Sequence, residues 1–566
     1  MNDIQMRFLS LVMFALPFMV AQAQSTNAPV NEDYYHWIDR YEIKSGKVIP
    51  QVFSSVKPYK RDAIILAIDS LNESGQFSTE ADRYNYTYLR NDSWEWSRSE
   101  ENQSKKPFLK HIYKKKSDFL YADLPEFDIH VNPVLYTSIG YDNQEGEDLY
   151  INTRGLEIRG MVDRKVGFYS FLSENQARLP NYVRSGMASN PVIPHEGFWK
   201  TFKDNGVDFF HVRGYIDFSL SKHIYMQFGN DKTFIGNGYR SLIFSDYSPP
   251  SLFFRTNVKV WKLNYLFQLN RVVADTQSFV SVSASNQRKY PSKYIAFHHL
   301  SINIGKKFNL GVFESVVFSP EDSLGNGSFD PSYLNPVIFY RAIEQQSGSP
   351  DNVLLGMDFK WLVTKRLSVY GQLAFDEFLL ENLKEGSGWW ANKYAIQGGL
   401  KYIDVAGVNN LDMQVETNIV RPYTYSHNTQ YGSYTSYRQS LAHPLGANFT
   451  EFIGIVRYQP LPKLNLIAKA IYAEVGRDST NTNYGSDLLK DNSTRVNEYG
   501  NFIGQGISTK ITYLDFTASY MLKHNLFIDV KQVIRVSNAP EIASKQNTSI
   551  TSLALRLNIG QRLYDF

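Results

Sequence analysis

The stretch from Phe228 to Asn257, FGNDKTFIGNGYRSLIFSDYSPPSLFFRTN, interrupts a long series of alternating apolar and polar residues. Its two adjacent prolines cannot donate to a strand ladder, and its glycines suit tight turns, which predicts a shaped loop between strands. The polar side chains that this loop offers to a ligand are Asn237, Tyr239, Arg240, Asp246 and Tyr247. The same side chains could instead satisfy the hydrogen bonds of the loop itself.

Aromatic residues crowd two further stretches that lack strand periodicity. Tyrosines recur between Tyr423 and Tyr437 beside amide and guanidinium groups, and a Trp-Trp pair occurs further towards the N-terminus. Flat rings stack on the C–H faces of sugars while forked polar groups bind hydroxyls, so these stretches suit a carbohydrate. The candidate residues are Trp389, Trp390, Tyr425, Tyr431 and Arg438. A membrane-interface girdle or a loop core would use the same residue types.

Signatures of catalysis, metals and nucleic acid do not stand out. The chain has no Gly-rich phosphate loop, no zinc-spaced histidine pair and no G-x-S-x-G elbow, and no spacing selects a Ser-His-acid set. His298 and His299 are neighbours, which in a strand point to opposite faces. The net charge of +3 is scattered, and cysteine is absent. We therefore expect no enzyme activity, no cofactor, no metal and no nucleic-acid partner.

The N-terminus resembles a secretory leader. Residues 8–20 form an apolar run after Arg7, followed by the small-x-small pattern Ala21-Gln22-Ala23, which predicts cleavage after residue 23. A membrane-anchoring helix is the alternative, but Pro17 interrupts the run and it is shorter than the roughly 20 residues that a span needs. Residues 1–23 are therefore predicted to be a signal peptide.

Residues 24–125 are predicted to be a helical periplasmic region with a linker. Ile64, Ala67, Ile68 and Leu71 follow the helical repeat, and Thr79 with Asp82 has capping-box spacing for a second helix. The lysine-rich stretch 99–118 is expected to be a charged linker. Its lysines are either solvated or in contact with phosphate or lipopolysaccharide.

From about residue 126 to the end, period two dominates. In residues 411–419 Leu411, Met413 and Val415 alternate with Asp412, Gln414 and Glu416. Further charged residues predicted to point inward are Glu157, Arg159, Arg213, Asp217, Asp515, Asp529, Lys531, Arg535 and Arg556. Both signs occur, which favours a lumen filled by paired charges and water, although a conducting porin stays open.

The connections between these strands alternate between tight and long. Tight turns are expected at 221–222, 306–307, 364–365, 461–462 and 523–524, and long loops at 176–205, 319–351, 422–447 and 476–508. Short turns on one side and long loops on the other, with 15% aromatic residues for interface girdles, predict an all-β outer-membrane barrel. We expect residues 126–566 to form about 18 antiparallel strands in contact with outer-membrane lipid. The last strand is expected to run almost to Phe566.

The loop that opens this section also carries a family resemblance. Gly236-Asn237-Gly238, Ser241-Leu242 and Ser245-Asp246 before Pro249-Pro250 resemble the central segment of the capsule-assembly Wzi family. The stretches YLNPVIFYRAIEQQSGSPDNVLLGMDFKW (333–361), LAHPLGANFTEFIG (441–454) and NYGSDLL (483–489) are similar to the Bacteroidetes branch that includes the gliding-motility protein RemB.

The resemblance implies a barrel that is closed at its periplasmic end by a small helical bundle and attaches exopolysaccharide to the cell surface of a Gram-negative bacterium. In the RemB branch it implies a part in surface motility, with periplasmic or motility-machinery partners reached through the helical region. The alternatives are a passive porin, a hydrolase on the barrel rim, or a structural subunit of a motility or secretion machine. A TonB-dependent receptor is disfavoured because no sizeable plug domain precedes the strands.

Overall fold

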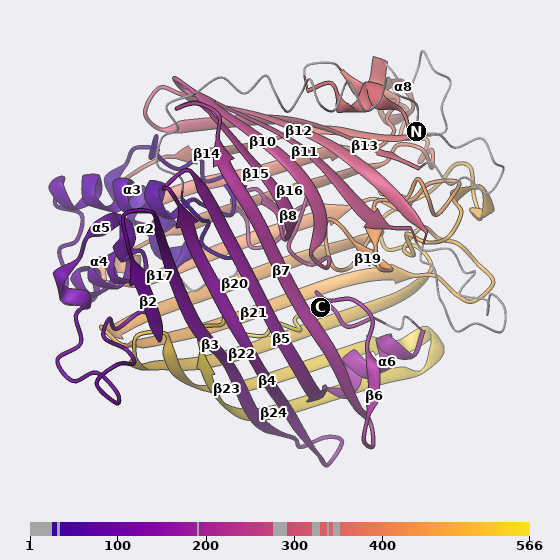
Figure 1. The fold of residues 1–566 in the computed structure, drawn as a ribbon. Coiled ribbons are helices and arrows are strands. Elements are labelled where there is room, and N and C mark those ends of the chain that lie inside the picture. The colour runs from indigo at the N-terminus through magenta and orange to yellow at the C-terminus, as the bar shows by residue number, and fades with distance from the viewer. Residues whose placement is uncertain are drawn as a thin grey trace, which may run out of the picture.

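A closed ring of eighteen antiparallel strands forms the body of the molecule (Figure 1). The computed structural model describes residues 25–30, 34–189, 192–274, 291–319, 329–336, 339–342 and 351–566. The predicted leader, residues 1–23, lies outside the described residues. The ring strands are β3 (Phe127–Asp142), β4 (Glu147–Val162), β5 (Val166–Arg178), β7 (Gly206–Ser219), β8 (Ile224–Asp231), β10 (Ser251–Val260), β11 (Leu263–Val273), β12 (Ser292–Ile304), β13 (Phe308–Phe318), β14 (Asn352–Leu362), β15 (Leu367–Phe375), β16 (Tyr394–Tyr402), β17 (Leu411–Val420), β20 (Phe449–Leu461), β21 (Leu464–Arg477), β22 (Ile507–Lys523), β23 (Leu526–Ala539) and β24 (Ser544–Leu557).

Strand β24 closes the ring by pairing with β3, from Ile550↔Asp142 to Leu557↔Leu135. The predicted alternation is confirmed: in β17 the even-numbered Asp412, Gln414 and Glu416 are buried on the inner face, while the odd-numbered residues face outward. Closure pairs every ring strand on both edges, and the apolar side chains take the outer face, which is how strands cross a bilayer. None of the described helices is both long enough and apolar enough to cross a membrane.

The two ends of the barrel differ as predicted. One end carries the tight turns 220–223, 261–262, 305–307, 363–366, 462–463 and 524–525 and the longer connection 403–410, and we call it the short-turn end. The opposite, long-loop end carries the connections 179–205, 421–448 and 478–506. Short elements outside the ring are α6 (Asn181–Ser189), α8 (Leu380–Lys384), β1 (Val56–Lys57), β2 (Leu120–Asp123), β6 (Lys200–Phe202), β9 (Phe234–Ile235), β18 (Thr435–Ser436) and β19 (Gln439–Ser440).

Four helices cover the short-turn end (Figure 1): α2 (Tyr35–Ser45), α3 (Arg61–Glu73), α4 (Glu80–Asp92) and α5 (Trp94–Ser97). The predicted stripe Ile64, Ala67, Ile68 and Leu71 is the buried face of α3. Helix α4 begins at a complete capping box, in which the Thr79 hydroxyl accepts from the Asp82 N–H and the Asp82 carboxylate accepts from the Thr79 N–H. Short helices need partners, and these pack on one another and on the turns of the ring.

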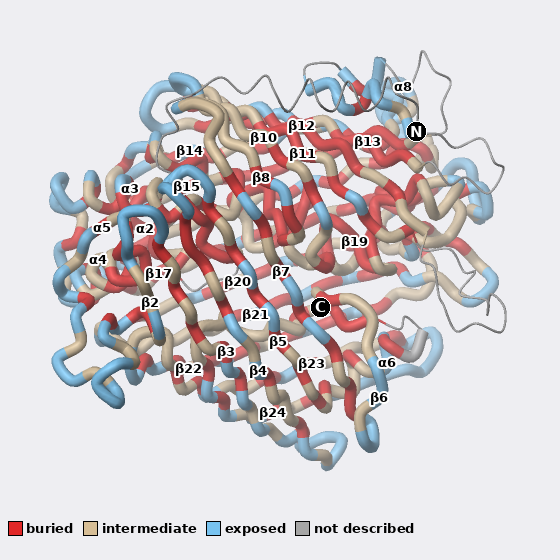
Figure 2. The backbone as a smooth tube through the Cα atoms, in the orientation of Figure 1, coloured by how far each residue is buried: buried red, intermediate tan, exposed pale blue. Residues whose placement is uncertain are grey.

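Two further segments enter the lumen, and Figure 2 shows a largely buried interior. Residues 232–250, between β8 and β10, fold inward from the long-loop end, one of the two placements open from the sequence; β9 in this segment pairs with β1. The expectation for the last strand is wrong. Strand β24 ends at Leu557, Asn558 adopts a left-handed φ of 53°, and residues 558–566 turn into the barrel, where Figure 1 marks the C-terminus.

Two hydrogen bonds donated by Asn558 hold this left-handed turn in place. Its backbone N–H donates to the Asn525 carbonyl over 3.1 Å, and its side-chain amide donates to the Pro133 carbonyl over 2.8 Å. Asparagine tolerates this backbone region better than most residues. We call residues 558–566 the C-terminal tail.

Candidate functional site

The loop 232–250 and the C-terminal tail meet at one carboxylate inside the barrel. Arg240 donates to the Asp565 carboxylate over 3.1 Å and to its backbone carbonyl over 2.6 Å. Lys469, from the inner face of β21, donates to the same carboxylate over 2.5 Å and to the Tyr239 hydroxyl over 2.8 Å. The Tyr239 hydroxyl also donates to Asp565. Three donors from two segments therefore converge on Asp565.

This arrangement keeps Asp565 ionised in a buried place. Burial alone would raise the pKa of its carboxyl, but the Arg240 guanidinium and the Lys469 ammonium outweigh it and hold the pKa well below its usual range. Burial likewise works against the charge on Arg240, and the carboxylates of Asp565 and Glu451 outweigh it, so the pKa of Arg240 is raised. The pair is a charge-assisted clamp between the loop and the tail.

Wall residues explain why the loop folds inward. The Glu416 carboxylate on β17 accepts the backbone N–H groups of Tyr239 and Arg240 over 2.6 and 3.0 Å. Gln372 on β15 accepts from the Leu242 N–H over 2.7 Å and donates to the Ile235 carbonyl over 2.9 Å. Loop backbone groups that would otherwise be unsatisfied are thus paired with buried polar groups of the wall.

Gly236 is required for this approach. Its φ is 129°, and a Cβ at this position would lie 2.1 Å from the Gln372 side-chain nitrogen. The glycine predicted to turn the loop therefore also lets it reach the wall.

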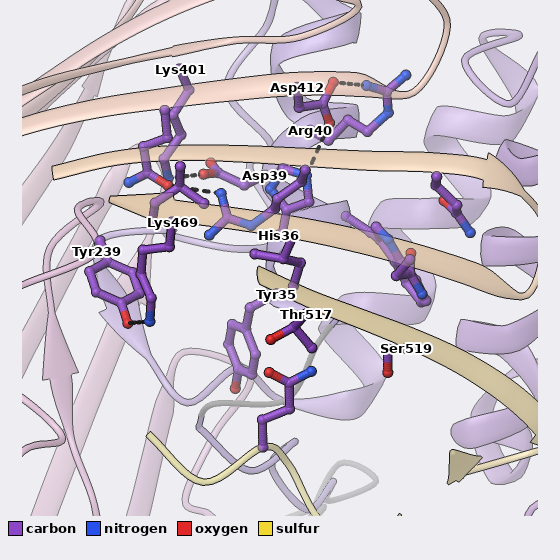
Figure 3. Close-up of a pocket in the computed structure, with 18 of the residues that line it drawn as sticks. Tyr35, His36, Asp39, Arg40, Tyr239, Lys401, Asp412, Lys469, Thr517 and Ser519 are labelled. Atoms are coloured by element: carbon purple, nitrogen blue, oxygen red, sulfur yellow. Dashed lines mark hydrogen bonds and ion pairs between the residues drawn. The ribbon is translucent and has the colours of Figure 1, made fainter. Parts of the chain in front are cut away.

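A charged cavity of about 260 Å³ lies between α2, the inward loop, the tail and the wall (Figure 3). Predicted residues Asn237 and Tyr239 line it, as do Asp39, Lys401 and Arg457. Asn237 is itself tied down, because its side-chain oxygen accepts from Ser54 over 2.9 Å and its carbonyl accepts from Lys401 over 2.7 Å. Figure 3 shows Lys401 against Asp39 and Arg40 against Asp412, so most charges here are already paired.

Asp246 and Tyr247 do not line this cavity. The Asp246 carbonyl accepts from the Lys232 ammonium over 3.0 Å. The Tyr247 ring contacts His195 and Phe566 edge-on, with centroids 4.9 and 5.8 Å apart. These contacts join the inward loop, the connection 179–205 and the tail.

Tyr425 is part of the loop core. It is fully buried, its hydroxyl donates to the Leu242 carbonyl over 2.7 Å, and its ring stacks on Tyr434 with centroids 5.9 Å apart. Tyr431 and Arg438 lie half-buried in the same connection between β17 and β20. Of the predicted tyrosine cluster, the structure therefore turns Tyr425 away from the surface.

Trp389 and Trp390 lie at the long-loop end, in the connection between β15 and β16. Both indole N–H groups donate to one oxygen of Glu498, over 3.2 and 2.9 Å. The Arg495 guanidinium lies 4.1 Å from the centre of the Trp390 ring and donates to the other Glu498 oxygen over 2.9 Å. We call Trp389, Trp390, Arg495 and Glu498 the tryptophan platform.

Backbone hydrogen bonds hold the platform together. Trp390 N–H donates to the Glu498 carbonyl over 3.0 Å, and Gly500 and Asn501 donate to Ser387 and Gly388, each over 2.9 Å. Tyr499 and Phe502 beside it are 57% and 64% exposed. Arg495 and Glu498 were missed from the sequence, although their stretch RVNEYGNF lies in a loop already predicted to be long. No local pattern indicated that two loops more than 100 residues apart pair through one carboxylate.

Histidines 298 and 299 lie on opposite faces of β12, as predicted. The His299 ring contacts Asp358 over 2.6 Å inside the barrel, whereas His298 packs against Tyr340 with centroids 4.1 Å apart. Within the described parts of the chain, no group of three His, Asp or Glu side chains is arranged to hold a metal ion.

Comparison with known proteins finds solved structures with a similar fold. No family model and no curated protein sequence matches this chain. Among solved structures it is similar to Wzi, an outer-membrane protein involved in group 1 capsule assembly in Escherichia coli and described as a carbohydrate-binding β-barrel. The TM-score is 0.56 at 12% identity, over 95% of this chain and 100% of that one. Pseudomonas aeruginosa OprD and OccK8 match at TM-scores of 0.41 and 0.38, each at 10% identity, over 76% and 75% of this chain and 92% and 97% of theirs.

The fold is therefore Wzi-like, and the predicted barrel class is confirmed. A closed antiparallel barrel with an apolar outer face is the architecture of Gram-negative outer-membrane proteins. The protein is an outer-membrane β-barrel. Short turns are typical of the periplasmic end of such barrels. The RemB-like branch stays a prediction.

Proposed function

We propose that the protein binds polysaccharide at the cell surface through the tryptophan platform. The observation that carries this proposal is the pre-formed surface of two indole rings, a guanidinium and a carboxylate at the long-loop end. Rings stack on sugar C–H faces, and Arg495 and Glu498 can exchange hydrogen bonds with hydroxyls. Loops that are already joined lose little conformational freedom on binding.

The Wzi-like fold supports the same function, because Wzi itself is described as a carbohydrate-binding barrel. A barrel that holds polysaccharide on the outside serves to attach a capsule. In a RemB-like role the same binding serves gliding, where a surface polymer must be held while the cell moves. Periplasmic or motility partners would reach such a protein at the helices of the short-turn end.

The lumen residues take a different part in this proposal. Asn237, Tyr239 and Arg240 already hydrogen-bond to Ser54, Glu416 and Asp565, and we assign them to holding the inward loop in place. The two indole rings of the platform are half-buried at the long-loop end, beside the exposed Tyr499 and Phe502. We therefore propose the connections β15–β16 and β21–β22, in place of the inward loop, as the glycan contact.

The experiment compares folded wild-type barrel with a Trp389→Ala/Trp390→Ala variant. The probe is surface polysaccharide purified from the producing cell, and the readout is Kd by biolayer interferometry. Losing two stacking rings costs about 1–3 kcal/mol, an increase in Kd of about 5- to 150-fold. Capsule retention and colony spreading of cells carrying the variant are scored separately, which separates attachment from motility.

The matched control is Trp261→Ala. Trp261 is an exposed tryptophan, at 74%, and it lies in the β10–β11 turn at the short-turn end. We expect unchanged polysaccharide binding in this variant. Equal Kd values for the platform variant and wild type would place the site elsewhere, and no binding by wild type would remove the function.

A further inference from the structure

The lysine-rich stretch expected to be a linker is a fixed hairpin at the short-turn end. Its base is buried: the Asn102 amide donates to the Ser117 hydroxyl over 2.9 Å, and the backbone bonds Ser104 N–H to Lys114 carbonyl and Lys116 N–H to Asn102 carbonyl span 2.9 and 2.7 Å. Asp118 at its end accepts from the Trp94 indole and contacts His130 over 3.0 Å. We call residues 102–118 the basic hairpin.

The tip of the basic hairpin is apolar and projects into solvent. Phe108 and Leu109 are 63% and 69% exposed. Leu109 and Lys110 have φ values of 48° and 66°, and the Ile112 N–H donates to the Phe108 carbonyl over 2.9 Å, so a tight turn presents the two apolar side chains. Exposing two adjacent apolar side chains to water contributes no burial to the stability of the fold.

Cations surround this tip. Lys105, Lys106, Lys110 and Lys114 are exposed, and among the described residues none of the four has a carboxylate within ion-pair distance. Lys115 lies 3.7 Å above the Trp94 ring and braces the base. An apolar tip inside a ring of unpaired ammonium groups is the pattern of a membrane-surface anchor.

The position of the hairpin favours the bilayer over the lumen. Strand β24 pairs with β3 only as far as Leu557, which lies opposite Leu135. Nearer the short-turn end, the same edge of β3 pairs with β2, from Leu120↔Val131 to Asp123↔Asp128. The hairpin precedes β2 directly, so it emerges at the barrel wall; Figure 1 shows it at the margin of the barrel mouth beside β2. Leu120 itself is exposed on the outer, lipid-facing side.

We propose that the basic hairpin docks on the periplasmic leaflet of the outer membrane. Phe108 and Leu109 insert among the acyl chains near the headgroups, and the four lysines contact phosphate groups of anionic phospholipid. The lysines are attracted to the anionic surface, and the apolar pair adds burial in the membrane. The hairpin would thereby fix the rotation of the helical region against the membrane plane.

The absence of cysteine from the chain makes the test direct. Leu109→Cys carries a nitroxide, and full-length protein is placed in nanodiscs of phosphatidylcholine with or without phosphatidylglycerol. Collision with oxygen and with a water-soluble nickel complex reports depth. We expect the label to be shielded from nickel and open to oxygen, most strongly with phosphatidylglycerol. The matched control is Phe502→Cys, a similarly exposed site at the long-loop end, which stays open to nickel.

Reversing the charges tests the cations separately. Lys105→Glu/Lys110→Glu/Lys114→Glu, carrying the same label, should lose the phosphatidylglycerol-dependent shielding while the barrel keeps its heat-modifiable migration. A Leu109 label as open to nickel as the Phe502 label in both lipids overturns the proposal and leaves the tip to a protein partner or to solvent. Polysaccharide binding is not involved in either outcome.

Discussion

Asp565 joins three parts of the chain inside the lumen. Its carboxylate accepts hydrogen bonds from Arg240 and Tyr239 of the inward loop and from Lys469 of strand β21. Buried ion pairs contribute little net stability relative to apolar packing, yet breaking one leaves uncompensated charge in a low dielectric. The clamp therefore specifies which segments meet in the lumen more than it adds free energy.

Asp565→Asn should destabilise the folded barrel by about 3–5 kcal/mol, because Arg240 and Lys469 stay buried without their counter-charge. The measurement is the free energy of unfolding from urea titration in lipid, followed by tryptophan fluorescence. Glu474→Gln is the control, since Glu474 and Lys510 form an exposed pair 3.6 Å apart, worth less than about 1 kcal/mol. Equal effects of the two substitutions would contradict the clamp.

The same carboxylate predicts a pH dependence. The folded-state pKa of Asp565 lies well below its usual range, so the unfolded state binds the proton first as pH falls. The contribution of ionised Asp565 to the free energy of unfolding is fully present above about pH 4, which is the pKa of an aspartate in the unfolded chain. This contribution is lost as the pH falls below that value. Wild type should lose stability steeply in this acid range, and Asp565→Asn should lose less. Parallel curves would show that other carboxylates dominate.

At the scale of elements, the helices of the short-turn end are joined to the wall by polar contacts. Arg40 of α2 donates to Asp412, the second residue of β17, and to Asp404 over 2.5 Å. Asn85 of α4 donates to Gln459 over 2.8 Å. Amphipathic periodicity predicts which helix face is buried, but these contacts fix where each helix sits.

Thr79→Ala should weaken the start of α4. The hydroxyl accepts from the Asp82 N–H over 3.0 Å and donates to Asn410 in the β16–β17 connection over 3.1 Å, so its loss costs about 1 kcal/mol. Hydrogen exchange of first-turn amides in α4 should accelerate about fivefold. Ser78→Ala, one residue away, is the control. Equal exchange in both variants would mean that packing alone holds this end.

At the scale of the whole molecule, three segments share the lumen: the helices, the inward loop and the C-terminal tail. These segments contact residues on the inner face of the barrel such as Glu416 and Lys469, and a charged cavity of about 260 Å³ lies between them.

We expect full-length protein in planar bilayers to show no steady conductance, because the lumen is occupied. Removing residues 25–97 together with 558–566 should produce stepwise openings, and each removal alone should produce fewer. Heat-modifiable migration checks that the ring has formed. Steady conductance by the intact protein would favour the porin alternative instead.

Period two and the alternation of turns with loops were enough to determine the barrel, its inner charges and the helical stripe of α3, because these patterns depend only on neighbours in the chain. The inward path of 232–250, the tail and the tryptophan platform were decided by tertiary structure. Arg240 and Asp565 are 325 positions apart, and Trp390 and Glu498 are 108 apart. Such partners come into contact only when the ring has closed. A local sequence pattern does not indicate which buried carboxylate pairs with a distant cation.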